Sequence, residues 1–262
     1  MTGLRRILFN ADDFGLTDGV CSGIAEAIAS GAVKSTTAMV CTSGARERLT
    51  QWGPKLPGRI GIHLQLTGGT PCLGAANVRS LVDERGEFPR AAGQLKADLA
   101  EVKREWAAQF ERLEQWGITP THMDSHHHVG TKPEILSAYV ETARSRGLPA
   151  RTISPGSTAL LRANGVACAD LCVTQWYDAD LTPRGLLRVI EASFASLKGS
   201  GTIEIMCHPA HADADLAARS SYVKQREREL KTLTSTELMK GLQRMDIEII
   251  AASSLAPRPS IA

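Results

Sequence analysis

The fold class is indicated first by the segment RILFNADDFG at residues 6–15. Its first half is an apolar run with the length of a buried β-strand, and Asp12 and Asp13 follow where that strand should end. A dinucleotide-binding sheet would carry a glycine-rich turn at this point. The acidic turn therefore favours a parallel (β/α) barrel and weakens the alternative of a doubly wound open sheet.

The rest of the chain repeats an alternation of short apolar runs and helical patterns. The runs predict strands at residues 6–10, 35–40, 59–66, 119–126, 150–154, 171–175, 202–208 and 246–251. Segments with a 3.6-residue period predict helices at about 17–31, 95–117, 131–140 and 182–199, the third opening on a capping box at Thr131–Glu134. About eight such units in 262 residues fit a barrel, for which ~250 residues is usual. We expect one domain over residues 1–262, with a polar tail from about residue 253.

The composition excludes several classes of protein. Hydrophobic residues make up 43% and charged residues 22%, which is enough apolar material for a large core and excludes a disordered chain. The net charge of +2 predicts no nucleic-acid partner and no anionic membrane surface. No apolar run has the length of a membrane span, and the first residues lack a signal-peptide core, so we expect a cytoplasmic location. The six cysteines are then expected as reduced thiols, with Cys168 and Cys172 packed in the core.

Polar residues gather where the predicted strands end. In the third strand, His63 and Gln65 alternate with aliphatic residues and should point away from them. The fourth strand places four residues on one face, His122, Asp124, His126 and His128. Near the end of the seventh, Glu204 and His208 share a face. Because the carboxyl ends of parallel strands form the active-site face of such folds, these groups should converge at one mouth.

Two imidazoles and a carboxylate form a three-ligand set with open positions, which suits zinc or another divalent first-row ion. A second carboxylate could accept a proton from water, and a separate histidine could protonate a leaving group. Adjacent Asp12 and Asp13 would then divide the roles of base and ligand. Each element also has a structural explanation: a hydrogen-bonded histidine, a helix-capping aspartate pair or a chance histidine tract. That all three structural explanations apply together at one edge of the sheet is the less favoured alternative.

Four motifs carry a resemblance to a known family. They are NADDFG at 10–15, GIHL at 61–64, THMDSHHH at 121–128 and CHP at 207–209. In this order they resemble the YdjC/ChbG-like carbohydrate deacetylases. The resemblance implies a distorted, TIM-like (β/α) barrel related to the NodB-type deacetylases. It also implies hydrolysis of the N-acetyl group of an amino sugar, as in a chitooligosaccharide, with release of acetate. Magnesium or zinc would be the cofactor, and relatives of this kind suggest a homodimer.

By motif position, the resemblance implies that Asp13, His63 and His126 bind the metal. Asp12 corresponds to the general base and His208 to the general acid.

Other positions are assigned supporting roles. Asp124 and His128 are expected to hydrogen-bond the metal-binding groups. Arg151 is loosely similar to an arginine that orients the catalytic aspartate in NodB relatives. Trp176 and Tyr177 follow the sixth predicted strand and could stack on a sugar, while Trp176 could equally fill the core.

Two other functions stay open from sequence. One is a metal-dependent hydrolase of another amide or ester bond. The other is a non-catalytic protein that binds a sugar or a metal on the same scaffold. The presence of both Asp12 and His208 favours an enzyme, because binding alone requires neither a base nor an acid.

Overall fold

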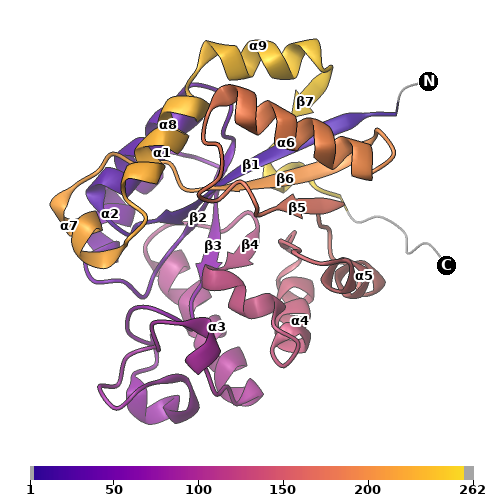
Figure 1. Cartoon of the computed structure of the whole chain (residues 1–262). Helices are drawn as coiled ribbons and strands as arrows, with labels where there is room; N and C mark the ends of the chain where they lie inside the picture. Colours follow the sequence, from indigo (N-terminus) through magenta and orange to yellow (C-terminus); the bar gives the residue numbers. More distant parts are fainter. Residues whose placement is uncertain (1–2, 257–262) are drawn as a thin grey trace.

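Among the residues that the structure describes, seven parallel strands form a curved sheet at the centre of the molecule (Figure 1). The structure is a computed structural model that describes residues 3–256. The strands are β1 (Arg5–Phe14), β2 (Ser35–Ala38), β3 (Ile60–Leu64), β4 (Met123–Ser125), β5 (Leu171–Val173), β6 (Gly201–Cys207) and β7 (Ile247–Ile249). Their order is β4-β3-β2-β1-β6-β5, and β7 pairs with the start of β1. Followed around the sheet, β1 to β6 keep their order in the chain, as in a (β/α) barrel, whereas β7 stands outside this order because β6 pairs directly with β1.

Helices surround this sheet (Figure 1). They are α1 (Asp18–Ala29), α2 (Ala45–Trp52), α3 (Leu99–Gln115), α4 (Leu136–Arg146), α5 (Pro155–Ala163), α6 (Pro183–Ser196), α7 (Ala214–Arg219), α8 (Lys224–Leu233) and α9 (Thr236–Arg244). Figure 1 shows α1, α2 and α8 on one flank and α3, α4 and α5 on another. Within the described residues, no helix is long and apolar enough to span a bilayer.

The alternation of side chains predicted for β3 is confirmed. Ile60, Ile62 and Leu64 are buried in the main hydrophobic core, whereas His63 points to the opposite, polar side of the sheet. The same core includes Trp106 of the predicted long helix, which is fully buried in α3. Period-two and period-3.6 patterns thus identified the buried faces of both kinds of element.

The predicted strand at 150–154 is wrong. Ala150 makes one isolated bridge to Met123, and α5 starts immediately afterwards at Pro155. Ser154 and Ser157 form a capping box there, which ends the extended segment before a strand can develop. The barrel is therefore distorted between β4 and β5.

The predicted helix start at Thr131–Glu134 is also wrong. Residues 126–131 form a 3₁₀ segment, η5 (His126–Thr131), and α4 begins at Leu136 without a side-chain cap.

The sequence patterns did not predict five further helices, which are α2, α5, α7, α8 and α9. At the carboxyl end, Ala252–Ser254 form one further 3₁₀ turn. Residues 257–262 of the expected polar tail lie outside the described residues.

Candidate metal centre and active site

The end of β1 directs two consecutive carboxylates to the same cavity. In a regular strand Asp12 and Asp13 would point to opposite faces. Asp13 instead has φ +70°, and the pairing of β1 with β2 shifts register between Ala11 and Phe14. A non-glycine residue rarely adopts this left-handed conformation, and where it does, it often marks a functional site. The local change in backbone direction lets both side chains line one pocket.

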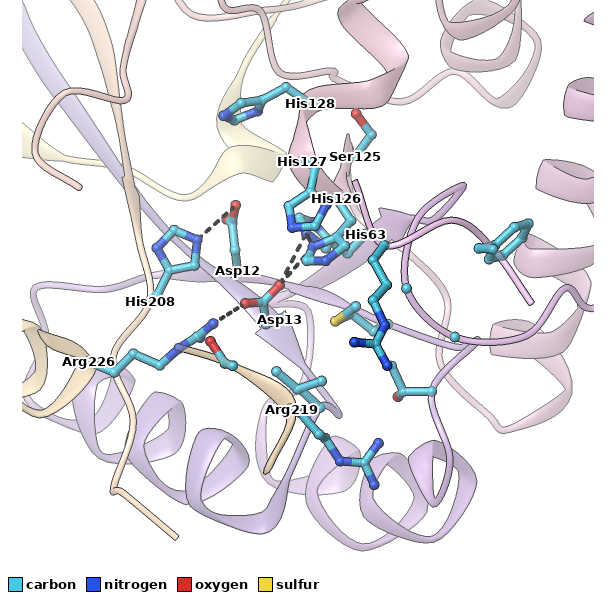
Figure 2. Close-up of a pocket in the computed structure, with 18 of the residues that line it drawn as sticks. Asp12, Asp13, His63, Ser125, His126, His127, His128, His208, Arg219 and Arg226 are labelled. Atoms are coloured by element: carbon cyan, nitrogen blue, oxygen red, sulfur yellow. Dashed lines mark hydrogen bonds and ion pairs between the residues drawn. The ribbon is translucent and has the colours of Figure 1, made fainter. Parts of the chain in front are cut away.

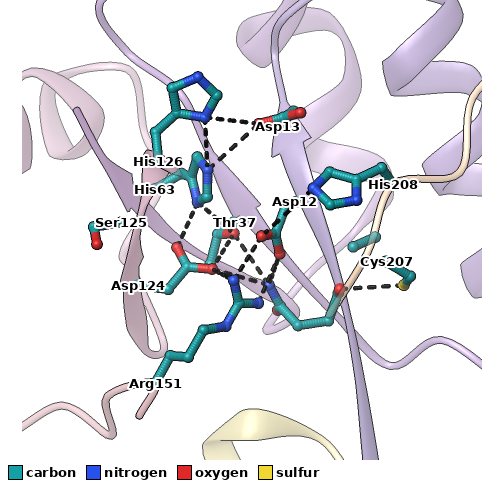
Figure 3. Close-up of polar contacts among 12 residues, drawn as sticks. Asp12, Asp13, Thr37, His63, Asp124, Ser125, His126, Arg151, Cys207 and His208 are labelled. Atoms are coloured by element: carbon teal, nitrogen blue, oxygen red, sulfur yellow. Dashed lines mark hydrogen bonds and ion pairs between the residues drawn. The ribbon is translucent and has the colours of Figure 1, made fainter. Parts of the chain in front are cut away.

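Three possible metal-binding atoms, one each from Asp13, His63 and His126, lie close together (Figures 2 and 3). Asp13 Oδ1 lies 3.4 Å from His63 Nε2 and 3.3 Å from His126 Nδ1, and the two nitrogens are 3.3 Å apart. The centre of a triangle with such sides is about 1.9 Å from each corner, close to the ~2.0–2.2 Å bonds that zinc makes to N and O. Asp13 Oδ1 is buried without a hydrogen-bond partner in the described part of the chain. The three residues predicted as ligands therefore lie close enough together that they could hold one metal ion.

Arg226 of α8 occupies the other oxygen of the same carboxylate. Its Nη2 donates to Asp13 Oδ2 at 2.6 Å, and both side chains are almost fully buried (Figure 2). Burial alone would raise the pKa of Asp13, but Arg226 and the neighbouring imidazoles hold it well below its usual value. Asp13 is therefore a carboxylate with one oxygen fixed and the other directed at His63 and His126.

Asp124 orients the first imidazole. His63 Nδ1 donates to Asp124 Oδ1 at 2.6 Å, and Thr37 donates to the second oxygen at 3.0 Å. This is the contact expected of a carboxylate that sets the tautomer of a metal-binding histidine. Burial lowers the pKa of His63, but the charges of Asp124, Asp13 and Asp12 outweigh it and raise the pKa to about 10. The site therefore attracts positive charge at the position of His63 Nε2.

Arg151 holds Asp12 from below in Figure 3. Its Nη1 and Nη2 donate to Asp12 Oδ2 and Oδ1 at 2.6 and 2.7 Å, and Asn10 donates to Oδ1 at 2.8 Å. The same guanidinium contacts Asp124 at 2.9 Å and Glu204 at 2.6 Å. Burial would raise the pKa of Asp12, but Arg151 outweighs it and lowers the pKa, so the carboxylate keeps its charge.

His208 faces Asp12 from the end of β6. Its Nε2 lies 4.0 Å from Asp12 Oδ2, and its backbone N–H donates to Glu229 of α8 at 2.5 Å. Glu229 also accepts the Tyr222 hydroxyl at 2.6 Å. Burial and the nearby Arg226 charge lower the pKa of His208 to about 4, whereas burial raises the pKa of Glu229 to about 7. His208 is therefore neutral at pH 7 in the absence of other ligands.

The cavity above these groups has a volume of about 860 Å³, and His128 lines it. Tyr177 also lines it, with 47% of its surface exposed, and its ring stacks on Tyr222 at 4.0 Å and 13°. Trp176 does not reach the cavity: it is fully buried, and its indole N–H donates to the carbonyl of Asp180 at 3.3 Å. A sugar could stack on Tyr177, while Trp176 fills the core, so the expectation for Trp176 as a sugar contact is not met.

The charges of the site are unbalanced. Four carboxylates, Asp12, Asp13, Asp124 and Glu204, are linked to two guanidinium groups, Arg151 and Arg226, and to His63, whose raised pKa makes its ring cationic. Four negative charges against three positive charges leave an excess of one, which becomes two when His63 loses its proton to bind a cation. Buried charges are stable only when paired, so this excess of negative charge suits an added divalent cation.

Sequence reasoning missed Arg226, Glu229 and Tyr222. The first two belong to the charged segment KQREREL, which looks like an exposed helix face. A signal was present: Arg226, Glu229, Leu230 and Leu233 recur at helical spacing, which puts two charged residues on the buried face of α8. No pattern within that segment names Asp13 or His208 as the partners.

Comparison with known proteins shows which family the chain resembles. Residues 6–244 match the model of the family described as YdjC-like protein. A carbohydrate deacetylase of Geobacillus stearothermophilus is 39% identical over 250 residues, covering 94% of this chain and 96% of the relative. One from Vibrio cholerae is 37% identical over 258 residues, covering 97% and 98%. A crystal structure from Enterococcus faecalis, of a protein with a suggested role in cellobiose-phosphate cleavage, has a TM-score of 0.86 at 35% identity and covers 97% of this chain and all of its own.

Proposed function

The chain belongs to the YdjC-like family, and on that basis we propose that it is a metal-dependent hydrolase that removes the N-acetyl group from an amino sugar of the chitooligosaccharide type. The observation that carries the proposal is the convergence of Asp13, His63 and His126 on one point, with a buried carboxylate oxygen that has no hydrogen-bond partner among residues 3–256. Magnesium and zinc are the ions we propose for this position.

These three residues would hold the cation, and Asp124 and Arg226 would keep the ligands in place through His63 Nδ1 and Asp13 Oδ2. A divalent cation supplies two effects when bound there: it polarises the acetamide carbonyl and lowers the pKa of a neighbouring water.

Asp12 is the proposed acceptor of the proton from the attacking water. Arg151 keeps this carboxylate ionised and fixed in direction, so it is available throughout the physiological pH range. The lowered pKa makes Asp12 a weak base, so a proton accepted there is held loosely and can pass on to a stronger base such as His208. As the water oxygen bonds to the carbonyl carbon, its proton moves to Asp12.

His208 is the proposed donor to the leaving nitrogen. Because burial keeps its ring neutral beforehand, it cannot start the reaction as an imidazolium. Its Nε2 is 4.0 Å from Asp12 Oδ2, close enough to receive the proton that Asp12 has accepted after a small movement. The C–N bond then breaks as this proton is delivered, leaving acetate and the free amine.

Acetate release from N-acetylglucosamine oligomers tests the proposal. We expect release to stop with a chelator and to resume when Mg²⁺ or Zn²⁺ is returned. His63→Ala should abolish release and metal retention together. The matched control is His211→Ala, which changes a half-exposed histidine bonded to Glu26 on the surface. Release that is insensitive to chelation, or lost equally in both variants, would refute the metal-dependent mechanism.

A further inference from the structure

Two cysteines contact each other behind one wall of the cavity. Cys41 follows β2 and is 3% exposed, whereas Cys72 lies in the loop after β3 and is half-buried. Their Sγ atoms are 3.7 Å apart, and both are free thiols. The proposed hydrolysis uses neither of them.

The backbone around the pair is fixed from two sides. Glu105 of α3 accepts the N–H groups of Cys72 and Leu73 at 2.8 and 3.0 Å, and Arg112 donates to the carbonyl of Cys72 at 3.0 Å. The carbonyl of Cys41 accepts the N–H of Thr70 at 2.9 Å. These hydrogen bonds fix the main chain at both cysteines, and this fixed main chain keeps the two thiols facing each other.

The loop also packs closely on Cys41. Gly69 has φ +93°, and a Cβ at that position would lie 2.3 Å from the carbonyl oxygen of Cys41. Gly68, Gly69 and Thr70 line the cavity. The two thiols therefore lie where the segment after β2 contacts the loop after β3, which forms part of the cavity wall.

A metal ion bound by Cys41 and Cys72 fits this position less well than a disulfide bond between them. Cys41, Cys72 and Glu105 have atoms within ligand distance of one another. The carboxylate, however, already accepts three N–H groups, including Gln109 Nε2 at 2.9 Å, and Arg112 adds positive charge nearby. A cation would have to displace these donors, whereas a bond between the two sulfurs would leave them intact.

We infer that Cys41 and Cys72 form a reversible disulfide by exchange with a low-molecular-weight disulfide such as oxidised glutathione. Cys72, the more accessible thiol, attacks one sulfur of the reagent as its thiolate, and one reduced thiol leaves. Cys41 then attacks the mixed disulfide, releasing the second reduced thiol. Two protein thiols are oxidised, one reagent disulfide is reduced, and their two protons end on the released thiols.

The order of the two steps follows from exposure. Burial raises the pKa of the Cys41 thiol, which makes it the slower nucleophile and suits it to the second, intramolecular step. To bond, the sulfurs must approach from 3.7 Å to about 2.05 Å, which side-chain rotation with a small loop movement can supply. The product would tie the cavity wall covalently to the end of β2.

The test uses the full chain, incubated with oxidised glutathione and then denatured for thiol counting and peptide mass mapping. We expect the count to fall from six to four, with one linked peptide pair containing Cys41 and Cys72 and full recovery with dithiothreitol. Cys41→Ser should instead trap glutathione on Cys72, and Cys72→Ser should leave all five remaining thiols free. The matched control Cys168→Ser, which alters another buried thiol, should still form the link.

Six free thiols after treatment of the wild type, or a link between other cysteines, would overturn the inference. Folding of each serine variant is checked by circular dichroism. As a second measurement, amide hydrogen exchange of residues 67–74 should slow in the oxidised protein, and unchanged exchange would show that the bond does not restrain the cavity wall. None of these measurements depends on hydrolase activity, so they succeed or fail independently of the proposed function.

Discussion

Replacing Arg151 with methionine removes the guanidinium from the centre of the site while keeping much of the apolar stem. Arg151 is 4% exposed and is hydrogen-bonded or ion-paired to Asp12, Asp124 and Glu204. The variant leaves these three buried carboxylates without that partner. Removing one member of a buried ion pair costs about 3–5 kcal/mol, and here one cation serves three anions. A shift of about 2–4 °C per kcal/mol for a domain near this size gives a fall in Tm of about 6–20 °C.

The pH dependence of this loss identifies its cause. In the wild type the pKa of Asp12 is lowered by Arg151, so its contribution to stability is present above about pH 4, the unfolded value, and is lost as pH falls. Without the guanidinium, burial raises the pKa of Asp12 above the unfolded value. That carboxylate then destabilises the fold increasingly as pH rises, so the difference between variant and wild type should be larger at pH 8 than at pH 5.

Urea and thermal denaturation at pH 5 and pH 8 measure both effects. The matched control is Arg188→Met, because Arg188 pairs with Asp180 at the surface, where the side chains are 66% and 48% exposed. Such a pair contributes less than about 1 kcal/mol. A loss for Arg151→Met as small as that of the control, or equal losses at the two pH values, would refute this account of the network.

Other predictions concern the metal, the sugar and the proton path. Cation binding near pH 8 should release about one proton, because the pKa of His63 is raised to about 10 before binding; calorimetry in two buffers of different ionisation enthalpy measures it, and zero release contradicts the assignment. Tyr177→Ala should raise KM about 2- to 10-fold with little change in kcat, while Tyr177→Phe keeps the wild-type KM; an effect confined to kcat would exclude sugar stacking. Trp176→Ala should leave KM unchanged but lower the free energy of unfolding by about 3–5 kcal/mol in denaturant titrations. His208→Ala and Asp12→Asn should each lower kcat about 10²- to 10⁴-fold with metal content preserved, and near-wild-type kcat in either variant removes that residue from the proton path.

The strands and their polar faces were largely predictable because strand periodicity is a local property. His63 alternates with aliphatic neighbours, Asp124 shares the two-residue alternation of its own strand, and backbone geometry alone sends both to the inner side of the sheet. The predicted strand at 150–154 is wrong for an equally local reason, the helix start at Ser154 and Pro155.

The chain alone therefore determined the parallel barrel, the order of its units and the polar residues that reach one edge of the sheet, since these depend on hydrophobic periodicity and on the common direction of the strands. Tertiary structure decided which groups meet there. Arg226 is 213 residues from Asp13, and Arg151 is 139 from Asp12, so no sequence spacing encodes either contact. Asp13 enters the cavity through a positive φ at the point where the pairing of β1 with β2 shifts register. Charge pairing inside a protein depends on distance and on exclusion of water, and only the packed chain sets either one.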